Sequence, residues 1–272
     1  MKKILLLILS VVMLLSTSLV FGACGDKNVI YVNTNAYFAP FEYYDGTKIV
    51  GVDVDIMNMV GEKLGKKVKF VNTDFGVIID NVQKGKKYDC GAAGITVTPQ
   101  RAEKVAFSNT YFTTVQYVIY KGDTFEKAGT TEGGVDYLLW EDLAGKMLGV
   151  QMDTTGHIFA DAEINDEEVG VLYNTGATLK TFDDAQLAAD GLGSKVDAVI
   201  VDKLPAEYIT SKNSQYKCLA LYYDAETATQ EDYAICVTKG NTELLDAINA
   251  VLAELGEEGI NALVAKHLGL EG

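Results

Sequence analysis

Histidine and cysteine, the side chains that most often bind transition metals, are scarce in this chain of 272 residues. It has two histidines and four cysteines, and no Cys-x-x-Cys spacing occurs, so the sequence contains no zinc pattern and no redox-active dithiol. Cys218 and Cys236 lie in strand-like runs and could pair, although free buried thiols are the favoured interpretation. We expect neither a metal nor a cofactor.

Arginine is almost absent. Arg101 is the only arginine among 23 basic residues, and the net charge is −15. This acidic balance argues against nucleic acid as a partner, but it leaves room for an anionic ligand at one local site. A guanidinium binds a carboxylate or phosphate through two parallel hydrogen bonds, which a lysine cannot do. Arg101 is therefore either part of an ordinary salt bridge or a fork that holds such a ligand.

The chain has one long apolar run, from Ile4 to Phe21, preceded by two lysines and followed by Gly22-Ala23-Cys24. A basic start, an apolar core and small residues before a cleavage point are typical of an export signal. Plain secretion and a retained membrane anchor both remain open. The small pair before Cys24 resembles a bacterial lipobox, which predicts a lipoprotein signal peptide over 1–23, acylation of Cys24 and attachment outside the cytoplasmic membrane.

The rest of the chain has no repeat and no low-complexity tract. Short apolar runs alternate with helical patterns, which indicates an α/β fold with a largely parallel sheet. Strands are expected over 29–33, 67–72, 88–93, 114–120, 147–151, 169–173, 196–201, 216–222 and 232–238. Helices are expected over 53–64, 76–85, 181–191, 203–211, 241–254 and 257–267.

Two strands, VQYVIY and YAICVT, bracket a self-sufficient α/β segment of about 110 residues. The economical arrangement has two lobes, with a short tether over 24–28, a first lobe over 29–116 and 238–272, and a second lobe over 117–237. Two crossings side by side form a hinge, so the cleft between the lobes is the expected ligand site.

Arg101 follows a capped turn. Thr98-Pro99 has the form of a helix start, where free backbone N–H groups and a partial positive charge favour anions. Gly94 lets a ligand approach the backbone closely, and Thr96 adds a hydroxyl. The segment predicts a carboxylate cradle, or else an ordinary capped turn whose arginine pairs with a nearby acid.

The run ITVTPQRAEKVAFSNTYF resembles the signature of bacterial family 3 solute-binding proteins, the receptors of ABC importers for polar amino acids. NAYFAPFEYYDGTKIVGVDVDIM resembles the opening of that family's first lobe. LAGKMLGVQMDTTG and KVDAVIVDKLPAEY resemble two segments of its second lobe. The resemblance covers nearly the whole chain after the signal peptide, and it implies the type II periplasmic-binding-protein fold with two hinge crossings.

The resemblance also implies roles for individual residues. Arg101 matches the arginine that binds the ligand α-carboxylate, assisted by Gly94 and Thr96. Asp202 matches the acid that binds the α-ammonium; taken alone, an acid between a buried strand and a helix is equally a helix N-cap. Further matching positions, which would face the ligand side chain, are Phe38, Phe75, Asn35 and Gln151. Thr154 and Thr155 open a predicted helix of the second lobe and should also face the ligand.

Two amides, two aromatic rings and no unpaired acid suggest a neutral polar ligand, with glutamine first and cystine next. Arginine or lysine stays possible, since aromatic rings can hold cations and Asp153, where the family usually has glycine, could supply charge. The resemblance implies a monomer that delivers its ligand to an ABC permease and is not an enzyme. The alternatives are a fold-related dehydratase, with Glu42 or Asp153 as proton donor, and a ligand-sensing receptor domain.

Overall fold

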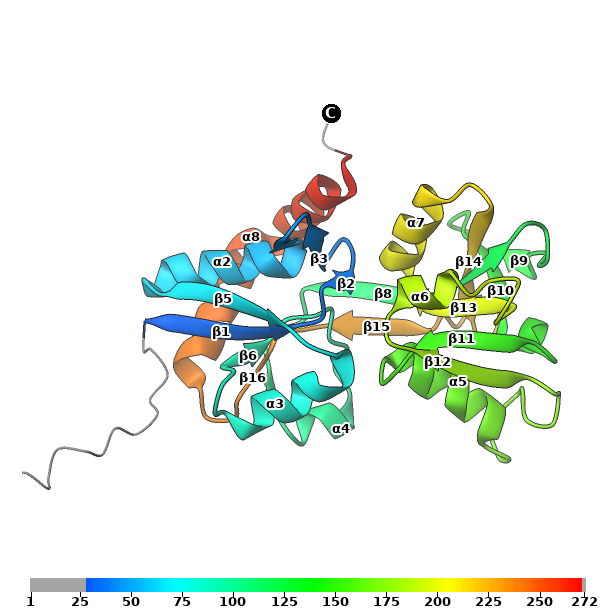
Figure 1. The fold of residues 1–272 in the computed structure, drawn as a ribbon, viewed down its shortest axis with the longest axis horizontal. Helices are drawn as coiled ribbons and strands as arrows, with labels where there is room; N and C mark the ends of the chain where they lie inside the picture. Colours follow the sequence, from blue (N-terminus) through cyan, green and yellow to red (C-terminus); the bar gives the residue numbers. More distant parts are fainter. Residues whose placement is uncertain (1–27, 271–272) are drawn as a thin grey trace, which may run out of the picture.

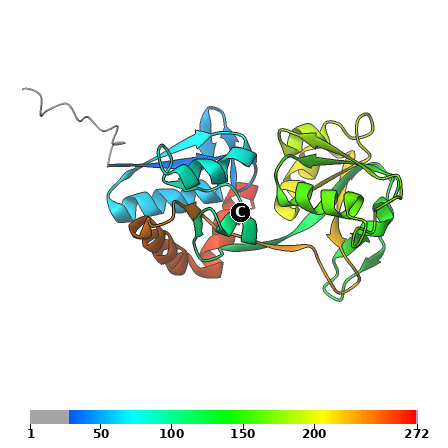
Figure 2. The same cartoon turned by 90° about the horizontal axis from the view of Figure 1, so that it is seen from below.

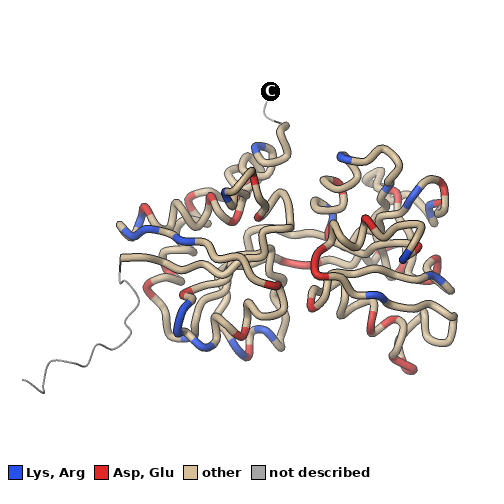
Figure 3. The backbone as a smooth tube through the Cα atoms, viewed as in Figure 1, with Lys and Arg blue, Asp and Glu red and all other residues tan. Residues whose placement is uncertain are grey.

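The computed structural model describes residues 28–270, which form two lobes joined by a pair of extended segments (Figure 1). The predicted signal peptide and Cys24 lie outside the described residues. Among residues 28–270, none of the helices combines the length and the apolar composition that a membrane-spanning segment requires. Lysine and acidic positions are mixed over both lobes in the view of Figure 3, as expected for a protein without a broad basic surface.

The first lobe is built on a sheet with the strand order β5-β1-β6-β16-β7. Strands β5, β1 and β6 are parallel, whereas β16 runs antiparallel to β6 and β7. The strands are β1 (Val29–Thr34), β5 (Lys67–Asn72), β6 (Cys90–Gly91), β7 (Ala106–Phe107) and β16 (Cys236–Val237). The helices of this lobe are α2 (Val52–Leu64), α3 (Ile78–Lys84), α4 (Pro99–Ala102) and α8 (Thr242–Leu268), with a 3-10 turn η1 (Phe75–Val77).

A small antiparallel sheet of β2 (Tyr37–Phe38), β3 (Glu42–Asp45) and β4 (Lys48–Val50) leads into α2. Gly51 makes that connection possible, because its φ is 139° and a Cβ there would overlap the carbonyl oxygen of Phe41. Helix α2 then buries Ile56, Met57 and Val60 on one face, as its apolar spacing predicts, and ends at Gly65 in the left-handed conformation.

The second lobe has the strand order β12-β11-β13-β8-β14-β10-β9. Strand β11 is parallel to β12 and β13, but the central β8 is antiparallel to both of its neighbours, so the sheet is mixed rather than largely parallel. The strands are β8 (Phe112–Lys121), β9 (Gly129–Thr130), β10 (Asp136–Leu139), β11 (Met147–Gln151), β12 (Thr178–Phe182), β13 (Ala198–Asp202) and β14 (Tyr216–Tyr222). The helices are α5 (Thr155–Asn165), α6 (Ala185–Ala189) and α7 (Lys203–Lys212), with a 3-10 turn η2 (Trp140–Leu143).

Strands β8 and β15 (Gln230–Tyr233) connect the lobes and lie side by side in both views (Figures 1 and 2). They pair antiparallel, with Gln230 opposite Val115 and Tyr233 opposite Phe112. The predicted strand over 232–238 is divided, so that its first part belongs to this connection and its second part, β16, belongs to the first-lobe sheet. We refer to β8 and β15 as the hinge strands.

Two further predicted elements differ from the structure. Residues 169–173 form turns against the end of α5, where Leu172 donates its N–H to the carbonyl of Glu163, and Val169 and Val171 are 70% and 54% exposed. The predicted helix over 181–191 is shorter, because β12 extends to Phe182 and Asp184 caps α6 by accepting a hydrogen bond from the N–H of Leu187.

The C-terminal helical region keeps the predicted break. Gly256 has φ 58° and ψ −173°, a conformation that glycine alone adopts readily, so α8 consists of two helical halves. Cys90, Cys218 and Cys236 are free thiols. Cys90 and Cys236 lie on paired strands but belong to clusters on opposite faces of the sheet.

Candidate functional site

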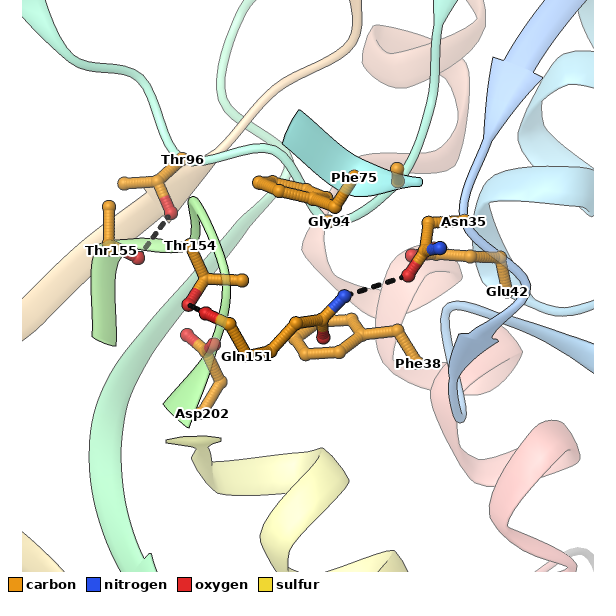
Figure 4. A pocket seen from close by; sticks show the side chains of 11 residues that line it. Asn35, Phe38, Glu42, Phe75, Gly94, Thr96, Gln151, Thr154, Thr155 and Asp202 are labelled. Atoms are coloured by element: carbon orange, nitrogen blue, oxygen red, sulfur yellow. Dashed lines mark hydrogen bonds between the residues drawn. The ribbon is translucent and has the colours of Figure 1, made fainter. Parts of the chain in front are cut away.

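A cavity lies between the lobes, at the carboxyl ends of several parallel strands. About 290 Å³ of space free of protein atoms lies in and around it, part of which is open to solvent. Its lining residues are Asn35, Phe38, Glu42, Phe75, Ala93, Gly94, Thr96, Gln151, Thr154, Thr155 and Asp202 (Figure 4). Strands β1 and β6 bring the first-lobe loops to this place, and β11 and β13 bring Gln151 and Asp202. Nine of the ten residues predicted to bind a ligand line the cavity.

Two amides meet across the cleft. Gln151 Nε2 donates a hydrogen bond to Asn35 Oδ1 at 2.9 Å, and Asn35 Nδ2 donates to the carbonyl of Thr73 at 2.8 Å (Figure 4). Both side chains are 3% exposed. The two lobes are therefore in direct polar contact at the end of the cavity where a ligand side chain is expected.

The threonines form a second contact between the lobes. Thr154 caps α5 by accepting a hydrogen bond from the N–H of His157 at 3.3 Å, and its own hydroxyl donates to the carbonyl of Gln151 at 2.8 Å. The hydroxyl oxygens of Thr155 and Thr96 are 3.4 Å apart. The helix start therefore presents hydroxyls and backbone N–H groups to the cavity.

Arg101 is the predicted site residue that does not line this cavity. Thr98 caps α4, as expected, by accepting a hydrogen bond from the N–H of Arg101 at 3.2 Å. The guanidinium donates to the carbonyl of Thr96 at 2.8 Å and to that of Asp153, on the other lobe, at 3.2 Å. It also lies over the Phe75 ring, 5.3 Å from the ring centre. Arg101 thus contacts Thr96 and Phe75, two residues that line the cavity, without lining it itself.

Asp153 does not place its charge in the cavity. Its φ is 64°, a conformation that suits the glycine expected there, and its side chain lies beside Gly76 in the hollow that Arg101 borders.

Burial lowers the pKa of Arg101 below its ordinary value, and the charge of Glu231 is the largest effect opposing this.

Asp202 is 5% exposed and comes directly before α7. Its side chain accepts no capping hydrogen bond from that helix, so the N-cap interpretation is not supported. Its Oδ1 has no hydrogen-bond partner among the described residues. Burial, and next the charge of Glu231, raise the pKa of Asp202 well above the ordinary value. A cationic ligand group in the cavity would stabilise the ionised form of such a buried acid.

Both aromatic residues of the predicted site line the cavity. Phe38 is 7% exposed and packs against Phe41 and Tyr233, with ring centres 6.1 and 6.4 Å apart. Phe75 begins η1 and contacts Arg101 with one face. Figure 4 shows both phenyl rings at the cavity, approaching it from different sides. An apolar or planar part of a ligand would lie between them.

The expectation of no unpaired acid near the ligand side chain is wrong, because Glu42 lines the cavity. It is 0% exposed, and neither carboxylate oxygen has a hydrogen-bond partner among the described residues. Burial raises the pKa of Glu42 well above its ordinary value, with further contributions from Asp53 and Asp202. The signal available in the sequence was one acid inside an aromatic run, FEYY, where a charge is out of place unless it has a role.

No cluster of three or more possible metal ligands occurs among residues 28–270. The chemistry present is that of a polar binding site: buried acids, amides, hydroxyls, aromatic rings and a guanidinium at the edge. Because all but Arg101 converge on one enclosed space from two lobes, the arrangement suits a small charged molecule with several polar groups.

Comparison with known proteins agrees with this description. The family model for bacterial extracellular solute-binding proteins, family 3, matches residues 30–270. The arginine-binding extracellular protein ArtP of Bacillus subtilis (strain 168) is 27% identical over 88% of this chain and 85% of its own. The arginine-bound, truncated ArgBP of T. maritima is 31% identical, with a TM-score of 0.69 over 84% of this chain and 97% of its own. An ancestral arginine-binding protein bound to glutamine is 32% identical, with a TM-score of 0.71 over 90% and 100% of the two chains. The predicted two-lobed fold is confirmed.

Proposed function

Because the chain belongs to the bacterial extracellular solute-binding proteins, family 3, we propose that it binds a free amino acid between its lobes and delivers it to an ABC permease. The named relatives are binding proteins, which argues against the dehydratase alternative. The cavity supports the proposal, since both lobes contribute polar side chains to one enclosed space. The lobe boundaries, the monomeric state, the signal peptide and the lipid anchor at Cys24 remain predictions.

The ends of the cavity suit the two charges shared by all amino acids. Asp202, with one buried oxygen that has no hydrogen-bond partner in the described part of the chain, is the proposed partner of the α-ammonium. Arg101, with Thr96 and Gly94, is the proposed partner of the α-carboxylate. A guanidinium has five N–H donors, and the bonds to Thr96 and Asp153 use two of them. Three donors therefore remain with which Arg101 could bind a carboxylate next to Thr96.

The ligand side chain that the cavity favours is cationic, and arginine is our first candidate in place of glutamine. The observation that carries this choice is Glu42, a fully buried carboxyl in the cavity whose oxygens have no hydrogen-bond partner within residues 28–270. A guanidinium would satisfy both of its oxygens and favour its ionised form, while the rings of Phe38 and Phe75 would hold the planar group. Glu42 and Asp202 together balance a ligand that carries two positive charges.

Glutamine remains the second candidate for a specific reason. The raised pKa of Glu42 favours a neutral carboxyl, which would donate a hydrogen bond to an amide oxygen. The pair formed by Gln151 and Asn35 could rearrange to satisfy the rest of a ligand amide.

Isothermal titration of the protein with arginine, lysine, glutamine and cystine distinguishes these candidates. Arginine is expected to bind most tightly. Glu42→Gln should weaken arginine binding roughly 100-fold, because it removes one partner of a buried ion pair, and should change glutamine binding by less than about tenfold. Glu163→Gln, in a half-buried acid on α5 away from the cavity, is the control and should leave both affinities unchanged.

Two results would count against these proposals. Tight glutamine binding without arginine binding would overturn the cationic ligand but keep the amino-acid receptor. No binding of any amino acid would overturn the receptor itself.

A further inference from the structure

Behind the cavity, a connected set of buried polar groups lies on the hinge strands. Glu231, on β15, is 4% exposed, and Gln116, on β8, is fully buried. Glu231 Oε2 accepts a hydrogen bond from the hydroxyl of Thr96 at 2.7 Å, and its Oε1 accepts one from Gln116 Nε2. One carboxylate thus joins both hinge strands to a residue that lines the cavity.

The strand register brings the same group close to the second lobe's acid. Gln116 lies directly opposite Asp202 in the pairing of β8 with β13. On its other side, β8 pairs with β15, where Glu231 lies opposite Thr114. Three adjacent strands therefore carry Asp202, Gln116 and Glu231 across the hinge, and Thr96 extends the set into the first lobe.

We propose that Glu231 is a positioning residue of the binding site, which orients Thr96 and Gln116. Its charge also sets the lowest pH at which the protein still binds its ligand. This inference rests on the proposed function, because it assigns Glu231 a role toward Thr96 and Asp202 as ligand contacts. Glu231 itself does not line the cavity.

The electrostatic part follows from the groups that face Glu231. Asp202 is a like charge on β13, Arg101 is an opposite charge on α4, and Tyr233 and Tyr223 are neutral phenols within its field. Asp202 must be ionised to bind an ammonium. After burial, Glu231 is the largest cause of the raised pKa of Asp202, so protons compete with the ligand at a higher pH than they would without Glu231.

The test is a series of titrations with arginine from neutral to acid pH on the full chain, with glutamine as ligand if arginine does not bind. In Glu231→Gln, which keeps the size and an acceptor oxygen, the pH at which affinity is half lost should fall by about one unit. Glu231→Asp keeps the charge but shortens the reach to Thr96. It should weaken binding about fivefold at neutral pH and leave the pH midpoint where the parent has it.

Asp232→Asn is the matched control. Asp232 is the next residue on β15 and accepts a hydrogen bond from the hydroxyl of Thr113 at 2.6 Å, so the change removes one charge from the other side of the same strand. Its affinity and pH midpoint should be those of the parent.

An unshifted midpoint in Glu231→Gln would overturn the electrostatic role, and parent-like affinity in Glu231→Asp would overturn the positioning role. If Glu231→Gln does not fold, Glu231→Asp still decides the positioning role, and Glu231→Ser, which also removes the charge, decides the electrostatic role by the same pH midpoint. A parent protein that binds no amino acid would instead reject the proposed function, so the two failures are distinguishable.

Discussion

The single arginine is placed where three requirements coincide. Its guanidinium lies over the Phe75 ring, donates to the carbonyl of Thr96 in its own lobe, and donates to the carbonyl of Asp153 in the other. A planar fork satisfies all three at once, whereas an ammonium has neither a flat face nor two fixed donor directions. Arg101 is therefore a contact between the lobes as well as the proposed carboxylate partner.

Arg101→Lys should weaken amino-acid binding about 10- to 100-fold, because the stacking and one of the two carbonyl bonds are lost although the charge is kept. Titration calorimetry with the preferred ligand measures this. Lys104→Ala is the control: Lys104 forms an exposed ion pair with Asp80 at 2.7 Å, so its removal should change affinity less than about twofold. Parent-like binding by Arg101→Lys would show that a point charge suffices.

Among the elements, the first turn of α2 holds residues next to the site in place through hydrogen bonds. Asp53 is 1% exposed, and its carboxylate accepts hydrogen bonds from the N–H of Gly94 at 3.0 Å and from the hydroxyl of Tyr111 at 2.5 Å. Gly94 lines the cavity, and Tyr111 precedes hinge strand β8. Burial raises the pKa of Asp53 to about 6, against the opposing effect of these two hydrogen bonds.

This shift predicts a pH dependence of stability. A carboxyl whose pKa is raised on folding stabilises the native state most below its unfolded pKa, and that contribution is lost as the pH rises through the folded value. Between roughly pH 4 and pH 7, Asp53 alone should lower the free energy of unfolding by at most about 3 kcal/mol.

Asp53→Asn should remove this contribution, which urea unfolding across that pH range would measure as the difference between parent and variant. Asp161→Asn, in an exposed acid on α5, is the control for loss of one carboxylate. Equal pH slopes in parent and Asp53→Asn would contradict the prediction.

Elements with a regular pattern were predictable and irregular ones were not. The apolar stripe of α2 and its terminal glycine predict the helix closely, since they reflect local geometry. The run 169–173 has strand composition, yet it forms turns because backbone hydrogen bonds to α5 compete with sheet pairing. The sequence does not indicate the neighbouring β12 as a separate strand, because three of its five residues are polar and exposed and the other two are only partly buried on an edge.

At the site, residues that belong to a motif were predictable, and those that act through tertiary contact were not. Thr96 and Asp202 stand in segments with a local signature. The only local signal for Glu42 is its place in the aromatic run FEYY, and nothing local to Glu231 indicates that it is buried, because its burial depends on β15 reaching the hinge. The sequence singles out Arg101, but its bond to Asp153 depends on how the two lobes meet.

For the whole molecule, the arrangement of the lobes depends on close approach at Gly76. A methyl group at this position would lie 2.8 Å from Cγ of Asp153, on the opposite lobe, which is too close for carbon atoms. Gly76→Ala should therefore hold the lobes apart and lower ligand affinity at least about tenfold, since the second lobe's contacts are made only on closure.

Small-angle X-ray scattering with saturating ligand should then give a larger radius of gyration for Gly76→Ala than for the parent. Adding Asp153→Gly removes the obstacle and suits the φ of 64° at that position, so the double variant should regain compactness and affinity. Compact, tightly binding Gly76→Ala would mean that the lobes do not meet in this way.

The ladder between β8 and β15 has a mechanical consequence. A pair of hydrogen-bonded strands bends easily perpendicular to its plane, but its interstrand hydrogen bonds resist sliding of one strand along the other. One lobe should consequently rotate toward the other as a rigid body about this strand pair, without a sliding motion. Residues as distant in the chain as Asn35 and Asp202 would then contact the bound ligand at the same time. Release of the ligand would require these contacts to break together in one opening motion.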